Sequence, residues 1–181
     1  MRIVLISGAS GAGKTTLQEE LLERLDAGRV ISNTTRPRRE ADKADEYRHL
    51  SKNEFRTLQD FLWTQEIHGN FYGTRDADVR IQLEKHGTAI IIGTVVCHSL
   101  LRKYYMCSSI EISSLHILSP DEAELKRRLM ERGDCIDDIK KRIHDCREWD
   151  NEAKRLSFIK LIHPGPKQHV LDTALEILEE I

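Results

Sequence analysis

The stretch GASGAGKTT, residues 8–16, lies between a short apolar segment and a charged one. The residues before it, RIVLIS (2–7), are apolar and β-branched, which predicts a buried β-strand. The residues after it contain leucines at every fourth position, Leu17, Leu21 and Leu25. That spacing predicts a helix, and we expect Gly28 to end it. A strand, a glycine-rich turn and a helix in this order are the setting of a phosphate-binding loop.

The loop itself matches the pattern G-x-x-x-x-G-K-[ST] at every defined position. Glycines let the backbone turn so that successive N–H groups face a polyphosphate, and the helix adds its positive end. We expect Lys14 to contact the terminal phosphates and the Thr15 hydroxyl to bind Mg²⁺. The motif predicts an ATP site made by nine residues: Gly8, Ala9, Ser10, Gly11, Ala12, Gly13, Lys14, Thr15 and Thr16.

Strand and helix signals alternate along the rest of the chain. Three apolar segments predict further strands, at 88–96, 113–119 and 155–164. Between them, Ser119 and Glu122 have the spacing of a capping box that would begin a helix, and SKNE (51–54) has the same spacing. The alternation predicts an α/β fold with a central parallel sheet. The segment 33–87, rich in Arg, Asp, His and aromatic residues, interrupts it and suggests an insertion over the ligand edge of the sheet.

Composition narrows the class of protein. A chain of 181 residues suits one domain, and its net charge of −2 gives no overall attraction to nucleic acid or anionic membranes. No apolar run reaches the roughly 18 residues of a membrane span, and the amino terminus has no signal-peptide pattern. The four cysteines are scattered without zinc-ligand spacing, so we expect reduced thiols. These features predict a cytoplasmic protein with no membrane or nucleic-acid partner.

Five segments then resemble, in order and nearly in spacing, those of guanylate kinases: SNTTRPRR (32–39), DEY (45–47), HGNFYGT (68–74), LKRRLMERG (125–133) and IKKRI (139–143). They span most of the chain. The resemblance implies a P-loop NTPase three-layer fold with a central parallel sheet. It also implies one domain, 1–181, with three parts: a core (1–32, 88–126 and 150–181), an acceptor-binding insertion (33–87) and a helical lid (127–149).

Arginines and tyrosines stand at the positions that hold the acceptor phosphate in that family. A phosphate monoester is bound well by planar guanidinium donors and hydroxyls that converge on its oxygens. The matching positions here are Arg36, Arg39, Tyr47 and Tyr72, with one residue fewer than expected between Arg39 and Tyr47. The resemblance therefore implies that these four side chains bind the acceptor.

Two further segments are similar to the family's arginine-rich lid. Phosphoryl transfer develops charge between donor and acceptor, and positive groups on a closing segment stabilise it and exclude water. Arg128 and Arg132 lie one helical turn apart, and Arg142 follows on the next helix. The resemblance assigns these arginines to the ATP phosphates, so with Lys14 they are the expected catalytic residues.

The base-reading positions differ from the family pattern. Guanylate kinases read like F-L-E-W-A-E-V-H-G-N-Y-Y-G-T, and the first Glu accepts hydrogen bonds from guanine. The segment FLWTQEIHGNFYGT has Trp63 there, and Ile92 and Thr94 replace a second pattern, Asp-x-Asp, which also supports Mg²⁺. Neither Trp nor Thr supplies a carboxylate for guanine's N1–H and 2-amino group. We expect four residues at the base: Ser32, Trp63, Thr74 and Thr94.

Three functions remain open at this point. The first is an ATP- and Mg²⁺-dependent kinase of a phosphomonoester, with a nucleoside monophosphate, GMP or dGMP first, as the acceptor. The second is a kinase of sugar phosphates, such as a ribose 1,5-bisphosphate phosphokinase. Those kinases share this fold, and the end of their corresponding strand is similar to Gly93 and Thr94. The third is a non-catalytic guanylate-kinase-like binding module, although such modules usually have a degraded phosphate loop. In each case we expect a monomer or a homodimer.

Overall fold

A five-stranded parallel sheet forms the centre of the protein. In the computed structural model, which describes residues 1–38, 42 and 45–180, the strand order is β2–β7–β1–β8–β9. The strands are β1 (Arg2–Gly8), β2 (Gly28–Arg29), β7 (Thr88–Ile92), β8 (Glu111–Ile117) and β9 (Lys160–Ile162). In the middle, β1 pairs in parallel with both neighbours, so that Ile6 lies opposite Ile92 on one side and Leu115 on the other. The predicted α/β fold with a central parallel sheet is confirmed.

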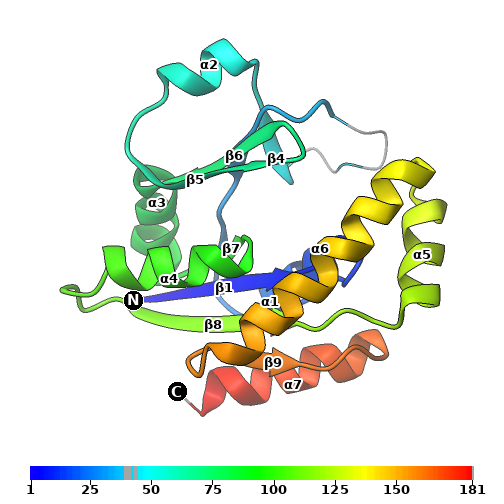
Figure 1. Ribbon diagram of the computed structural model, residues 1–181. Coiled ribbons are helices and arrows are strands. Elements are labelled where there is room, and N and C mark those ends of the chain that lie inside the picture. Colours follow the sequence, from blue (N-terminus) through cyan, green and yellow to red (C-terminus); the bar gives the residue numbers. More distant parts are fainter. Residues whose placement is uncertain (39–41, 43–44, 181) are drawn as a thin grey trace.

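Helices cover both faces of this sheet and complete three layers (Figure 1). One core cluster joins Val4 and Ile6 to α1 (Lys14–Arg24), α5 (Glu122–Glu131), α6 (Ile136–Arg155) and α7 (Lys167–Glu179). The other cluster joins Ile3 and Leu5 to α3 (Asp76–His86) and α4 (Val95–Tyr104). Successive residues of a strand point to opposite faces, which is why neighbouring residues of β1 belong to different clusters.

A second, four-stranded sheet stands over the core with the order β4–β3–β6–β5 (Figure 1). Its elements are β3 (Ser32–Thr34), β4 (Tyr47–His49), β5 (Phe61–Ile67) and β6 (Asn70–Arg75), joined by the short helix α2 (Lys52–Thr57). Phe55 of α2 stacks on Phe61, with ring centroids 4.9 Å apart. A Cβ atom at Gly73 would lie 2.6 Å from the Phe61 ring, so this packing requires a glycine.

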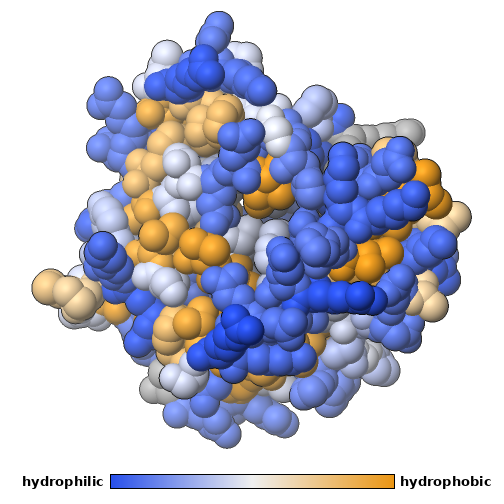
Figure 2. Space-filling view, in the orientation of Figure 1, coloured by the Kyte–Doolittle hydropathy of each residue, from blue (hydrophilic) through white to orange (hydrophobic). Residues whose placement is uncertain are grey.

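Hydrophilic side chains predominate on the face of the molecule seen in Figure 2, over the small sheet as well as the core. Apolar patches lie between them and are small on this face. None of the helices within the described ranges combines the length and apolar character that a membrane span requires.

Local details differ from the sequence predictions. Helix α1 ends at Arg24, and Gly28 lies in β2, where a Cβ atom would collide with Gln82 of α3. The strand predicted over 88–96 ends at Ile92, because Thr94 caps α4 and the following valines are helical. The helix predicted to start at Ser119 is capped instead by Asp121, whose side chain accepts from the Glu124 N–H. The predicted strand 155–164 shrinks to β9, since α6 continues to Arg155.

The buried face of β1 gives a direct test of the packing. Replacing Ile3, which is fully buried, with alanine is expected to lower the free energy of unfolding by about 2–5 kcal/mol, because a cavity remains in the core. Ile81 on α3 is 56% exposed, and Ile81→Ala is expected to change that free energy by about 0.5 kcal/mol or less. Urea unfolding of the two variants measures both values. Equal losses would contradict the packing described here.

Candidate active site

The loop between β1 and α1 exposes its backbone to the neighbouring cavity, and its two alanine side chains point into the core. Gly8 has φ of +146°, and a Cβ atom there would lie 2.6 Å from the Ile117 carbonyl oxygen. Gly13 has φ of +103° at the position that caps α1. Ala9 and Ala12 are buried in the core under the loop. An anion in this loop would therefore meet backbone N–H groups and the positive end of α1.

Lys14 lies inside the loop. Its Nζ donates to the carbonyl oxygens of Gly8, at 3.0 Å, and Ala9, at 2.8 Å. Burial, together with the nearby positive charge of Arg132, lowers the pKa of this ammonium group to about 8. A phosphate bound beside Lys14 would restore the charge that burial disfavours.

A cavity of about 380 Å³ opens beside the loop. Loop residues on its wall are Ser10, Gly11, Gly13, Lys14, Thr15 and Thr16. Asp42 and Glu46 also line this cavity, and the Thr15 hydroxyl lies 3.4 Å from Glu46 Oε1. Glu46 was missed as a site residue in the sequence, although it directly precedes Tyr47.

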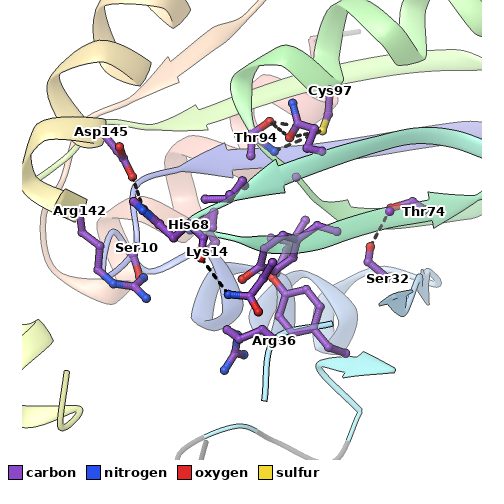
Figure 3. Close-up of a pocket in the computed structure, with 18 of the residues that line it drawn as sticks. Ser10, Lys14, Ser32, Arg36, His68, Thr74, Thr94, Cys97, Arg142 and Asp145 are labelled. Carbon is purple, nitrogen blue, oxygen red and sulfur yellow. Dashed lines mark hydrogen bonds and ion pairs between the residues drawn. The ribbon is translucent and has the colours of Figure 1, made fainter. Parts of the chain in front are cut away.

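Three arginines contact the phosphate loop. One lies in α5, one directly follows α5, and one lies in α6. Arg128 donates to the Gly11 carbonyl oxygen at 3.1 Å. Arg132 and Arg142 both donate to the Ser10 hydroxyl, at 2.9 and 2.7 Å. The arginines that the sequence separates by up to 14 positions thus converge on one loop, as Figure 3 shows for Arg142 and Ser10.

A second cavity, of about 440 Å³, lies between the small sheet, the end of β7 and α6 (Figure 3). Seven of the eight predicted acceptor residues line it: Ser32, Arg36, Tyr47, Trp63, Tyr72, Thr74 and Thr94. The eighth, Arg39, lies outside the described residues. Arg38 lines the cavity and was missed in the sequence. Compared with the family, the chain is one residue shorter in this segment. If that gap is placed before Arg38 instead of after Arg39, Arg38 aligns with the second phosphate-binding arginine of the family.

The side chains predicted to bind the acceptor phosphate contact one another in this cavity. Arg36 forms an ion pair with Asp42 at 2.8 Å, and its guanidinium lies 5.7 Å from the centre of the Tyr47 ring. Tyr47 and Tyr72 pack edge to face with centroids 6.0 Å apart. Burial and the nearby Glu46 raise the pKa of Tyr47 well above its usual range. Its hydroxyl therefore stays protonated and can donate to a phosphate oxygen.

Neutral side chains form the far end of the cavity. Ser32 and Thr74 share a hydrogen bond of 2.7 Å, and Trp63 is buried against the core. The Thr94 hydroxyl donates to Gln65 Oε1 at 2.5 Å. Gln65 also lines the cavity and was missed, although strand alternation from Trp63 places it on the same face.

The two cavities share part of their walls. Lys14, Arg36, Tyr47, Tyr72 and Arg142 line both. A group that fills one cavity and a group that fills the other would therefore meet between a lysine, two arginines and two tyrosines. This arrangement suits two phosphates that react with each other.

A contact joins the small sheet to α6 across the opening. His68, in the turn between β5 and β6, lies 2.8 Å from the Asp145 carboxylate (Figure 3). Its backbone has φ of +49°, which is unusual for a residue other than glycine. The sequence prediction used His68 only as part of a motif, whereas the structure gives it a partner on the helix that carries Arg142.

A buried chain of hydrogen bonds holds the end of β1. The Ser7 hydroxyl lies 2.7 Å from His98 Nε2 and 2.8 Å from His116 Nδ1, and His116 Nε2 lies 2.9 Å from Asp150 of α6. Burial lowers the pKa of His98 to about 3, with a further contribution from His116. The residue before the phosphate loop is thus tied to α4, β8 and α6.

Comparison with solved structures supports the fold. The crystal structure of guanylate kinase from Anaplasma phagocytophilum superimposes with a TM-score of 0.67 and covers 99% of this chain and 85% of its own. The sequence identity is 21%, so this likeness concerns the fold alone.

Sequence comparison is more specific. The chain is 35% identical to the guanylate kinase of Porphyromonas gingivalis over 78% of each protein. It is 36% identical to that of Clostridium tetani and 37% identical to that of Clostridium perfringens strain 13, over 72% of this chain but only 63% and 61% of those proteins. The family profile named guanylate kinase matches residues 1–181. The chain therefore belongs to the guanylate kinase family, a family of ATP-using phosphotransferases.

Proposed function

We propose that this protein transfers the γ-phosphoryl group of ATP to GMP, or to dGMP, and releases ADP and the nucleoside diphosphate. One observation carries the proposal. A complete phosphate loop lines one cavity, the predicted acceptor residues line the next, and Lys14, Arg36, Tyr47, Tyr72 and Arg142 belong to both. Membership of the guanylate kinase family makes GMP the first acceptor to test.

The donor phosphates would bind in the phosphate loop. Backbone N–H groups of residues 8–16 would hold the polyphosphate, and Lys14 would exchange its two carbonyl partners for phosphate oxygens. Arg128, Arg132 and Arg142 would stabilise the charge that develops during transfer. Their present hydrogen bonds to Ser10 and Gly11 place the guanidinium groups at the loop already.

Mg²⁺ fits the donor cavity. The Thr15 hydroxyl and the carboxylates of Asp42 and Glu46 are oxygen donors, which this ion prefers. No cluster of three or more His, Cys, Asp or Glu side chains suited to a metal exists within the described ranges, but Mg²⁺ usually takes only one or two carboxylates with phosphates and water. We propose that Thr15 and Glu46 hold the ion, which would neutralise charge on the ATP phosphates.

The acceptor phosphate would bind between Arg36, Tyr47 and Tyr72. An acceptor phosphate oxygen is already anionic at neutral pH, so the reaction needs position and charge rather than a strong base. Tyr47 would donate a hydrogen bond through a hydroxyl that burial keeps protonated. Arg39, which lies outside the described residues, or Arg38 in its place, would add a second guanidinium.

We also propose a division of labour along the chain. The core (1–32, 88–126 and 150–181) would hold ATP, the insertion (33–87) would hold the acceptor, and residues 127–149 would act as the lid. The substrates would be small nucleotides rather than nucleic acid or membrane, and the protein would work in the cytoplasm as a monomer or homodimer.

ADP release tests the function directly. ATP and Mg²⁺ would be supplied with GMP, dGMP, AMP, CMP, UMP, dTMP or ribose 1,5-bisphosphate, and ADP would be measured. Turnover with GMP or dGMP supports the proposal. Turnover with ribose 1,5-bisphosphate alone would favour a sugar-phosphate kinase, and no turnover with any acceptor would favour a binding module.

The lowered pKa of Lys14 predicts a pH dependence. ATP affinity should fall, by up to about tenfold between pH 7 and 9, because the free ammonium group loses its proton near pH 8 while ATP stays ionised. Calorimetric titration at several pH values measures this. In Lys14→Met, the affinity should be lower at pH 7 and should lack this fall. An unchanged fall in the variant would assign the titration to another group.

Arg36 should affect the acceptor more than the donor. Arg36→Ala is expected to raise the KM for GMP by about 10–100-fold, because a charged hydrogen-bond donor to phosphate is lost. The KM for ATP should change less, by less than about threefold, because Arg36 lies where the two cavities meet and the donor phosphates keep the phosphate loop, Lys14 and the other arginines as partners. Arg56, exposed on α2, provides the control Arg56→Ala, which should leave both values unchanged. A larger effect on ATP would overturn the assignment.

Glu46 should affect metal dependence. Glu46→Gln is expected to raise the Mg²⁺ concentration needed for tight ATP binding by about 10–100-fold, because one carboxylate near the ion is lost. Calorimetry at varied Mg²⁺ measures this without turnover. Glu66→Gln, on an exposed position of β5, is the matched control. If Glu46→Gln leaves the Mg²⁺ dependence unchanged, Glu46 does not hold the ion.

A further inference from the structure

Gln65 occupies the base end of the acceptor cavity, on the same face of β5 as Trp63. Its amide oxygen accepts from the Thr94 hydroxyl at 2.5 Å and from the Cys97 thiol at 3.7 Å. Figure 3 shows Thr94 and Cys97 together at this end, with dashed lines that converge between them. Both neighbours supply hydrogens to the amide oxygen, so the amide is held with that atom toward the end of β7.

The amide nitrogen of Gln65 remains available to a ligand. Within the described part of the chain, Nε2 makes no hydrogen bond and is not among the buried polar atoms that lack a partner. It therefore offers two N–H donors at a cavity wall. Such donors select an acceptor, such as a keto oxygen, and oppose an amino group, which presents hydrogens of its own.

Trp63 adds a wall that cannot accept a hydrogen bond. Its indole has one donor and no acceptor, and the side chain belongs to the buried cluster that includes Val79 and Leu83 of α3. An amino group directed at this wall would have no acceptor there. The 2-amino group would then gain no hydrogen bond from this wall and would lose its water there, so the wall gives GMP no advantage over a purine that lacks the group.

The carboxylates that line the acceptor cavity lie on α6. Among the described residues that line it, the acidic ones are Asp138 and Asp145, both on α6. Asp145 is bonded to His68, and Figure 3 shows this pair on the opposite side from Ser32 and Thr74. The Ser32 and Thr74 hydroxyls can rotate to donate or accept, so they suit either kind of group.

We infer that the acceptor pocket reads the 6-keto group of a purine through Gln65 and leaves the 2-amino group unread. The substrate class is then the 6-oxopurine nucleoside monophosphates, which include inosine monophosphate as well as GMP. This inference rests on the proposed function, because it concerns the acceptor of the same reaction. The products are ADP and the corresponding nucleoside diphosphate, formed by transfer of one phosphoryl group to an anionic phosphate oxygen.

Turnover with three purine nucleotides tests the inference. For the wild-type protein, the kcat/KM with inosine monophosphate should be at least one tenth of that with GMP, and the kcat/KM with AMP should be at least a hundredfold lower than that with GMP. Calorimetry with the same three nucleotides separates binding from turnover. Comparable values for the first two support the inference.

The other outcomes are distinct. If GMP is phosphorylated and inosine monophosphate is rejected by a hundredfold or more, the inference is wrong and the proposed function stands. If AMP is used as well as GMP, Gln65 does not read the 6-position. If none of the three is phosphorylated, the proposed function fails and the inference fails with it.

Variants assign the effect to residues. Gln65→Met keeps the length of the side chain without the amide, so the preference for GMP over AMP should fall at least tenfold. Gln168→Met, an exposed position on α7, is the matched control and should keep that preference. Trp63→Glu supplies an acceptor for the 2-amino group and should raise the ratio of GMP to inosine monophosphate at least tenfold. Thermal unfolding of each variant confirms that it is folded, and unchanged ratios in folded variants would overturn the inference.

Discussion

The parallel pairing of β1 with β7 and β8 is the constraint on which the site depends. β8 ends opposite Gly8 and β7 ends opposite Ile6, so the phosphate loop after Gly8 and the Thr94 corner after Ile92 lie at the same edge of the sheet. Hydrogen bonds between Ser7 and both His98 and His116 hold this edge in place. The central sheet therefore fixes the position of the proposed donor loop relative to Thr94, one wall of the proposed base pocket.

Segments outside the sheet complete the site by converging on that edge. Arg132 and Arg142 reach Ser10 from the α5–α6 side, while Arg36 and Tyr47 come from the small sheet. Such groups repel one another in the absence of anions, and neighbouring carboxylates offset this: Asp134 pairs with Arg132, and Asp42 pairs with Arg36. Bound phosphates would replace these carboxylates as partners of the arginines. Ligand binding would then be coupled to the positions of both segments.

The sequence predicted the elements with long, local signals and missed features that depend on tertiary contacts. The strand before residues 8–16, the helix after them and the Ser51–Glu54 capping box were predicted correctly because their signals lie within a few residues. The cap of α5 was assigned to Ser119 instead of Asp121, a shift of two positions that spacing alone does not resolve. Gln65 and Glu46 acquire their significance only from Thr94 and Thr15, which are 29 and 31 positions away.

In the proposed base pocket, neutral side chains stand where the family pattern has charged carboxylates. Two family carboxylates would add negative charge close to an acceptor phosphate and to ATP, and the arginines would have to offset it. Trp63 and the Gln65–Thr94 pair add none, so the positive groups shared by the two cavities would have no base-reading carboxylate to offset. The cost is specificity, because a neutral amide distinguishes keto from amino at one position whereas a carboxylate also selects neighbouring N–H groups. A pocket of this kind is expected to favour charge balance and a broader purine class over strict selection of guanine.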